Sequence, residues 1–190
     1  MTIPVFIASS DRFADCEWMA PFSIRENTEK PVSIHIVRPQ WQGMQEHGCT
    51  GFTNVRFAVP EIAKGMGYEF AVYLDVDMLI LGDISELYDY RQPGHWVGLA
   101  DGSNEVSVID TSLQFPAKET LHRYKKHQLN SHVVPDIPLS WNCEDKVGDG
   151  MKLLHFTDLS AQPWFYKHPN KEAVAIYESY LGRHRPFADA

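Results

Sequence analysis

The stretch that most constrains the fold runs from Phe70 to Asp77 and reads FAVYLDVD, an apolar run that ends in two carboxylates two positions apart. Such a run predicts a buried strand whose end delivers charged groups to one edge of a sheet. Ligands of open α/β sheets bind in the crevice beyond the carboxyl ends of the strands. We therefore expect Asp75 and Asp77 to lie at a ligand-binding edge.

Asp75 and Asp77 would repel each other there, because burying two like charges is costly unless a cation compensates them. A divalent metal is such a cation, and carboxylate oxygens suit Mg²⁺ or Mn²⁺, of which Mn²⁺ also accepts imidazole. His155 ends a short apolar run late in the chain and could reach the same edge. The alternative is that the two acids begin a turn after a core strand and that His155 is a structural histidine.

The alternation of apolar runs and helical patterns predicts an α/β fold with a mostly parallel sheet covered on both faces. We expect one domain over residues 1–190, because the length of 190 residues suits one well-buried core. Predicted strands cover 3–8, 32–37, 70–77, 95–100, 106–110 and 151–156, and predicted helices cover 11–24, 54–66, 116–128 and 170–181, with a short helix from 84 and a loop over 130–150.

Charge and composition restrict the kinds of partner that this protein can bind. A net charge of −8 without a block of Lys or Arg argues against nucleic acid, since phosphate neutralisation requires clustered cations. No apolar run approaches the roughly 20 residues that a membrane-spanning helix needs. The start, MTIPVFIASSDRF, is unlike a signal peptide, so a cytoplasmic location is expected, and the three cysteines are expected to be free thiols.

Two segments together resemble a known family. YLDVDMLILGDISELYD and the later HFTDLSAQPW, which begins at His155, are similar to motifs of glycosyltransferase family 8, the glycogenin and bacterial lipooligosaccharide galactosyltransferase group. The resemblance implies a GT-A type fold, with a Rossmann-like mixed, mainly parallel sheet flanked by helices on both faces. It also implies that Asp75, Asp77 and His155 bind Mn²⁺ (or Mg²⁺), which bridges the diphosphate of a UDP-sugar, and that Asp75 and Val76 lie at the nucleotide.

Further segments extend the resemblance to the donor site. IASSDRFA is similar to the family's opening strand and loop, which makes Ser9, Ser10 and Asp11 candidate contacts to the uridine and Phe13 a candidate aromatic residue beside the uracil. VRFAVPEI resembles the helix whose arginine faces the donor, so Arg56 is a candidate contact to the diphosphate or the sugar. A guanidinium group suits phosphate oxygens geometrically.

The sequence also departs from the family. Gln162 stands where the family has a lysine, Asp158 stands where it has a glycine, and the five residues Gly102 to Val106 replace a long excursion that shapes the acceptor site. The family's pair of an acidic residue and a glutamine has no counterpart over 128–136. The donor half therefore resembles the family more closely than the acceptor half does.

These departures leave the stereochemical outcome open. An inverting transfer would need a carboxylate as general base, and Glu105, Asp136 and Asp158 are the candidates. The expected reaction is metal-dependent transfer of a sugar from a UDP-sugar to a hydroxyl of a glycan or protein-linked acceptor.

Two other functions fit parts of the pattern. A phosphatase of the haloacid-dehalogenase type would use Asp75 as nucleophile and Asp77 as general acid, and the segment Val147 to Gly150 resembles that family's late GDG motif, although Leu153 stands where an acid is expected. A noncatalytic nucleotide-sugar-binding module, one domain of a larger polypeptide, would explain the shortened acceptor region.

Overall fold

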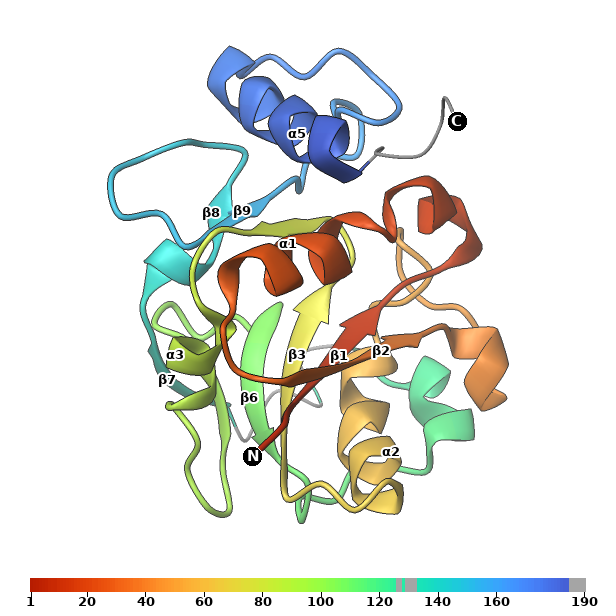
Figure 1. Ribbon diagram of the computed structural model, residues 1–190. Helices are drawn as coiled ribbons and strands as arrows, with labels where there is room; N and C mark the ends of the chain where they lie inside the picture. The colour runs from red at the N-terminus through yellow and green to blue at the C-terminus, as the bar shows by residue number, and fades with distance from the viewer. Residues whose placement is uncertain (126–127, 129–132, 185–190) are drawn as a thin grey trace, which may run out of the picture.

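The computed structural model describes residues 1–125, 128 and 133–184, which form a six-stranded main sheet in the order β2-β1-β3-β6-β5-β7 (Figure 1). β1 pairs in parallel with β2 and β3, and β5 pairs in parallel with β7, whereas β6 runs antiparallel between β3 and β5. The predicted mixed, mainly parallel sheet is confirmed. Its strands are β1 (Ile3–Ala8), β2 (Val32–Val37), β3 (Phe70–Asp75), β5 (Trp96–Leu99), β6 (Val106–Asp110) and β7 (Val133–Ile137).

A second, three-stranded sheet joins the middle of the chain to its later part. It consists of β4 (Met78–Ile80), β9 (Leu153–His155) and β8 (Cys143–Glu144), in the order β4-β9-β8. β4 and β9 are antiparallel, with Met78 opposite His155. Because β4 follows β3 after a turn of two residues, this pairing brings His155 to the end of β3.

Helices flank the main sheet. α2 (Val59–Gly65) and α3 (Ile84–Tyr88) contact β3, while α1 (Met19–Asn27) contacts β4 and α5 (Lys171–His184). Figure 1 shows α5 at the end of the molecule that carries β8 and β9. The shorter 3-10 helices are η1 (Asp11–Cys16), η2 (Pro39–Gln42), η3 (Val55–Ala58), η4 (Lys118–Arg123) and η5 (Leu139–Trp141).

The core follows from the apolar runs. All six residues of β1 are buried, and five of the six residues of β3 are buried, as expected for strands that are covered on both faces. A second cluster joins α1, β4, β9 and α5 through Met19, Leu79, Leu154, Phe156, Ala173, Tyr177 and Tyr180. This cluster fixes the small sheet, and with it His155, to the end of the main sheet.

Several helix boundaries follow from local chemistry. Asp83 accepts a hydrogen bond from the Ser85 backbone N–H at 2.8 Å and starts α3, as the sequence predicts. Asn170 likewise accepts hydrogen bonds from the first turn of α5. Pro60 lies in the first turn of α2, which confirms a late helix start rather than a kink.

Three predicted helices and one predicted loop differ in the structure. The helix expected over 11–24 is divided into η1 and α1, and that expected over 54–66 into η3 and α2. In the segment expected as a helix over 116–128, residues 118–123 form the 3-10 helix η4, and residues 126–127 lie outside the described part. The loop expected over 130–150 is wrong where the structure describes it, because it holds β7 and β8; β7 is an edge strand and so tolerates Pro135.

No helix among the described residues combines the length and the apolar composition that crossing a lipid bilayer requires.

Candidate metal centre and its cavity

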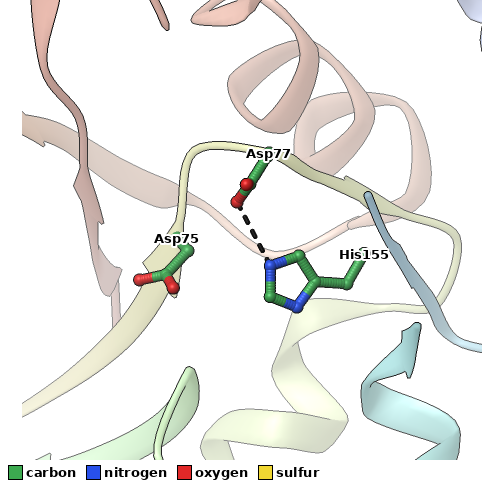
Figure 2. A group of neighbouring side chains, drawn as sticks. All are labelled: Asp75, Asp77 and His155. Atoms are coloured by element: carbon green, nitrogen blue, oxygen red, sulfur yellow. Dashed lines mark hydrogen bonds and ion pairs between the residues drawn. The ribbon is translucent and has the colours of Figure 1, made fainter. Parts of the chain in front are cut away.

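Two acids and a histidine converge at the end of β3. Asp75 is the last residue of β3, Asp77 lies in the turn before β4, and His155 is the last residue of β9. Each side chain offers a ligand atom, these atoms all lie within 4.8 Å of one another, and the three residues are 3–6% exposed. Figure 2 shows the imidazole ring of His155 facing the carboxylate of Asp77, with Asp75 beside them. The predicted convergence of Asp75, Asp77 and His155 is thus present.

His155 is held at both ring nitrogens. Its Nδ1 lies 2.8 Å from Oδ1 of Asn142, and its Nε2 lies 3.2 Å from Oδ1 of Asp77. The amide nitrogen of Asn142 donates to Glu144 at 3.4 Å, so the amide oxygen is the atom that accepts from Nδ1. In neutral His155 the lone pair is therefore on Nε2, which faces the two acids, as a metal ligand requires.

Nearby carboxylates change the proton affinity of His155. Burial alone lowers its pKa, but the attraction and hydrogen bond of Asp77, with smaller contributions from Asp75 and Glu105, raise the pKa above its ordinary value. A proton and a metal ion would compete for the same nitrogen, Nε2.

Asp75 is held by two side chains that face it inside the protein. Nη2 of Arg56 lies 3.2 Å from both of its carboxylate oxygens, and the hydroxyl of Tyr73 donates a hydrogen bond to it. Burial raises the pKa of Asp75, and so does Asp77, while Arg56 opposes the shift. The carboxylate is therefore fixed in place but only partly balanced in charge.

Arg56 is itself buried, with 3% of its surface exposed, and is tightly bound. Its Nε donates to the Thr53 carbonyl oxygen at 2.9 Å, its Nη1 donates to Oδ1 of Asn104 at 2.7 Å, and Glu105 lies 3.6 Å from Nη1. In this structure its guanidinium group orders Asp75. A contact to a diphosphate would require some of these bonds to be exchanged, and the predicted donor contact stays a prediction.

The cluster opens onto a cavity of about 230 Å³. The loop over residues 49–53 forms one wall. This loop requires Gly48, which has a φ of +76° and at which a Cβ would lie 2.2 Å from Oγ1 of Thr53. Besides the three cluster residues and Arg56, the lining consists of Cys49, Thr50, Thr53, Glu105, Glu144, Thr157 and Leu159.

The charges around this cavity favour a cation. Four carboxylates, those of Asp75, Asp77, Glu105 and Glu144, face one guanidinium group, that of Arg56. Two carboxylate oxygens and one imidazole nitrogen are ligands that suit Mn²⁺, and the oxygens alone suit Mg²⁺. The residues present thus fit a divalent metal ion.

Comparison with solved structures identifies similar folds. LgtC, described as a galactosyltransferase and crystallised with donor and acceptor sugar analogues, matches over 95% of this chain and 96% of its own in an active-site mutant, with a TM-score of 0.66 and 12% identity. GlyE of Streptococcus pneumoniae TIGR4, also described as a glycosyltransferase, matches with a TM-score of 0.63 and 11% identity. The chain has the fold of these glycosyltransferases.

The extent of the match differs among these proteins. The alignment covers 96% of this chain but 63% of GlyE, and 98% of this chain but 50% of the bifunctional glycosyltransferase WbbM, which has a TM-score of 0.60 and 13% identity. No protein-family model and no curated protein sequence matches the chain. The likeness to a glycosyltransferase that the sequence predicts is confirmed at the level of the fold.

The candidate uridine contacts lie outside the lining of the cavity, and one of them supports its wall. Ser9 and Ser10 are buried, and Ser10 donates to the carbonyl oxygen of Thr50, a residue of the cavity wall, at 2.7 Å. Asp11 is exposed and forms an ion pair with Arg38 at 2.5 Å. None of the three lines the cavity, so a direct contact to a nucleoside remains a prediction.

Phe13 and Val76 are buried in the core. Phe13 has no exposed surface and makes an edge contact with Phe52, with ring centroids 5.4 Å apart. In this structure its ring therefore offers no face on which a base could stack. Val76, in the turn between Asp75 and Asp77, is also fully buried, so only its backbone could meet a ligand.

The three candidate general bases lie in different places. Glu105 lines the cavity, on the side of Arg56. Asp136 is exposed on the edge strand β7, where it accepts a hydrogen bond from Gln92 at 3.0 Å. Asp158 is exposed, and hydrogen bonds from Ser160 lower its pKa, which makes it a weaker base. Of the three, the structure brings only Glu105 to the cavity.

Several residues of the site were not predicted. Tyr73 lies two positions before Asp75 in β3 and hence on the same face of the sheet, a period that would have identified it. Gln162, which stands in place of the family's lysine, donates to Oδ2 of Asp77 at 3.2 Å. Glu144 lines the cavity because β8 pairs with β9, with Glu144 beside His155. That pairing has no local signal in the sequence.

Proposed function

We propose that the protein is a metal-dependent glycosyltransferase that moves a sugar from a UDP-sugar to a hydroxyl group of a glycan or protein-linked acceptor. The observation that carries the proposal is the buried cluster of Asp75, Asp77 and His155, which opens onto a cavity in a chain with a glycosyltransferase fold. The sequence resemblance supports a uridine nucleotide as the donor.

Asp75, Asp77 and His155 would hold Mn²⁺ or Mg²⁺. The imidazole nitrogen favours Mn²⁺, since Mg²⁺ prefers oxygen ligands throughout. A bound divalent ion would neutralise the charge that develops on the leaving diphosphate. Asn142 and Gln162 would keep His155 and Asp77 aligned for this role, because each donates to or accepts from one ligand side chain.

Arg56 would contribute through position and charge. Its guanidinium group fixes the Asp75 carboxylate and adds positive charge at the wall of the cavity, where the charge of a leaving diphosphate would develop. In the transfer, the acceptor oxygen forms a bond to the anomeric carbon. The bond from that carbon to the phosphate oxygen breaks with its electron pair, which leaves on UDP, and the hydroxyl proton passes to a base.

Calorimetric titration with UDP tests the proposal. We expect UDP to bind in the presence of Mn²⁺ and to bind far more weakly without it. We expect an Asp77→Asn variant to bind UDP weakly whether or not Mn²⁺ is present. UDP release from a panel of UDP-sugars would then identify the donor sugar. Failure of UDP to bind with Mn²⁺ or Mg²⁺ would refute the proposal.

A second candidate is a noncatalytic nucleotide-sugar-binding module of a larger polypeptide. It is favoured by the tight turn that replaces an acceptor-shaping excursion: the Leu99 N–H donates to the Ser103 carbonyl oxygen at 2.9 Å, and a Cβ at Gly98 would lie 2.5 Å from that oxygen. The partial coverage of GlyE and WbbM agrees with it. Metal-dependent UDP binding without UDP release from any UDP-sugar would support this module over the enzyme.

A further inference from the structure

A second cavity adjoins the one at the metal centre. It has a volume of about 370 Å³, within the range of about 300–1,000 Å³ that is usual for small-molecule sites. Asp101, Leu139 and residues 142–144 and 146–148 line it. We call it the side cavity. Asp101 belongs to the tight turn after β5.

Glu144 forms the wall between the two cavities, because it lines both. Its backbone is paired with that of His155 in the small sheet, and its Oε1 accepts a hydrogen bond from Nδ2 of Asn142 at 3.4 Å. The same Asn142 holds His155 in its ring orientation. The Glu144 carboxylate is thus tied to the candidate metal ligands while it remains exposed to solvent.

The lining of the side cavity suits a sugar. The carboxylates of Asp101 and Glu144 and the ammonium group of Lys146 can each take hydrogen bonds to hydroxyl groups. Leu139, which is 50% exposed, and Val147 provide apolar surface for the C–H face of a pyranose ring. Charges of both signs favour a neutral glycan over a strongly anionic ligand.

We propose that the side cavity is the acceptor subsite and that Glu144 is the carboxylate that receives the proton of the attacking hydroxyl. This inference rests on the proposed glycosyl transfer. A lone pair of the acceptor oxygen forms the new bond to the anomeric carbon, the bond from that carbon to the phosphate oxygen breaks with its electrons going to UDP, and the hydroxyl proton passes to Glu144. Glu144, which lines both cavities, thereby replaces Asp136 and Asp158 as the candidate base, and also Glu105, which lines only the cavity at the metal centre and lies 3.6 Å from Arg56.

The first experiment measures UDP release from the donor UDP-sugar with water as acceptor. Glu144→Gln should lower kcat by about 100-fold or more, the usual contribution of a general base. The affinity for UDP with Mn²⁺ should stay within about twofold of the wild type. The matched control is Asp149→Asn, the same change on a nearby exposed residue that lines neither cavity.

The second experiment locates the acceptor. The full chain, with labelled Leu and Val methyl groups and saturated with UDP and Mg²⁺, is titrated with methyl β-galactoside and methyl β-glucoside. We expect saturable NMR shifts at the Leu139 and Val147 methyl groups, and we expect Leu139→Trp, which fills the cavity, to abolish them.

The two proposals fail in different ways. Equal UDP release by Glu144→Gln and Asp149→Asn, or sugar-dependent shifts that avoid Leu139 and Val147 or do not arise at all, would overturn the acceptor assignment and leave metal-dependent UDP binding intact. Absence of metal-dependent UDP binding in the wild type would instead overturn the glycosyltransferase, and the acceptor assignment with it.

Discussion

Opposite ends of the β3–β6 strand pair each carry a buried aspartate, and the two are held differently. At one end Asp75 is bound by the side chains of Arg56 and Tyr73. At the other end Asp110, whose register partner is Phe70, accepts hydrogen bonds from the backbone N–H groups of Gly94 at 2.5 Å and Ser112 at 2.7 Å.

The proton affinities of the two acids differ in the same way. Burial raises the pKa of Asp75, and Asp77 adds to that rise. Burial also raises the pKa of Asp110, but the backbone hydrogen bonds from Gly94 and Ser112 outweigh it and lower the pKa below its ordinary value. The backbone hydrogen bonds satisfy the carboxylate of Asp110, so its role is structural, whereas Asp75 belongs to a cluster that retains excess negative charge.

Cavity size does not distinguish these two ends. The cavity that Asp110 lines has a volume of about 500 Å³, larger than the cavity of about 230 Å³ at Asp75. Among the described residues, only Asp75, Asp77 and His155 bring three potential metal ligands together. This comparison shows that converging carboxylates without enough positive charge identify the metal centre better than the volume of a cavity does.

The largest effect that the comparison predicts concerns Arg56. Arg56→Met leaves Asp75 buried without its cation and beside Asp77, which should lower the free energy of unfolding by about 3–5 kcal/mol in urea titrations. The double variant Arg56→Met/Asp75→Asn removes both charges and should recover part of the loss. A loss below about 1 kcal/mol in the single variant would show that the ion pair contributes little.

The second-largest effect is a difference in Mn²⁺ binding between variants at the two ends of the strand pair. Asp77→Asn removes one of three ligands and should weaken Mn²⁺ binding by at least about 100-fold, because even residues that only orient ligands contribute about 10–100-fold. Electron paramagnetic resonance of free Mn²⁺ measures this without reference to activity. Asp110→Asn is the matched control and should bind Mn²⁺ like the wild type; equal weakening in both variants would contradict the assignment.

A smaller effect tests how the ligands are oriented. Asn142→Ala removes the acceptor for Nδ1 of His155 and should weaken Mn²⁺ binding by about 10-fold. Asn142→Asp keeps an acceptor oxygen at that position and should restore most of the affinity. If Asn142→Ala binds Mn²⁺ as tightly as the wild type, the hydrogen bond does not prepare His155 for the metal.

Much of the donor side could be predicted because its signals are local. FAVYLDVD carries its own burial pattern and its own acids, and His155 ends an apolar run, so the strand end and the three candidate ligands follow from short segments. Tyr73 could have been added from the period of two in β3. These features need no knowledge of which distant strands pair.

The remainder depends on contacts between distant residues. β7 has half-buried valines and an exposed Pro135, a pattern that is the same as that of a loop until the neighbouring β5 is known. Glu144 reaches the cavity only through the pairing of β8 with β9. Phe13 was predicted to lie beside a base, and in the structure it packs against Phe52 in the core. The sequence could not distinguish these two positions, because an aromatic ring after a strand has the same sequence signal in either.

The smallest predicted effect concerns Asp110, at the end of the β3–β6 strand pair opposite the metal centre. Because the folded-state pKa of Asp110 is lowered, its contribution to stability is fully present above its unfolded pKa of about 4 and is lost as pH falls through the folded value. Asp110→Asn should therefore be less stable than the wild type by about 1 kcal/mol at neutral pH. In urea titrations, the difference between the two proteins should shrink steadily below about pH 4. A difference that is constant or grows with acidity would mean that Asp110 is not held as an anion by Gly94 and Ser112, and the contrast with Asp75 would then rest on position alone.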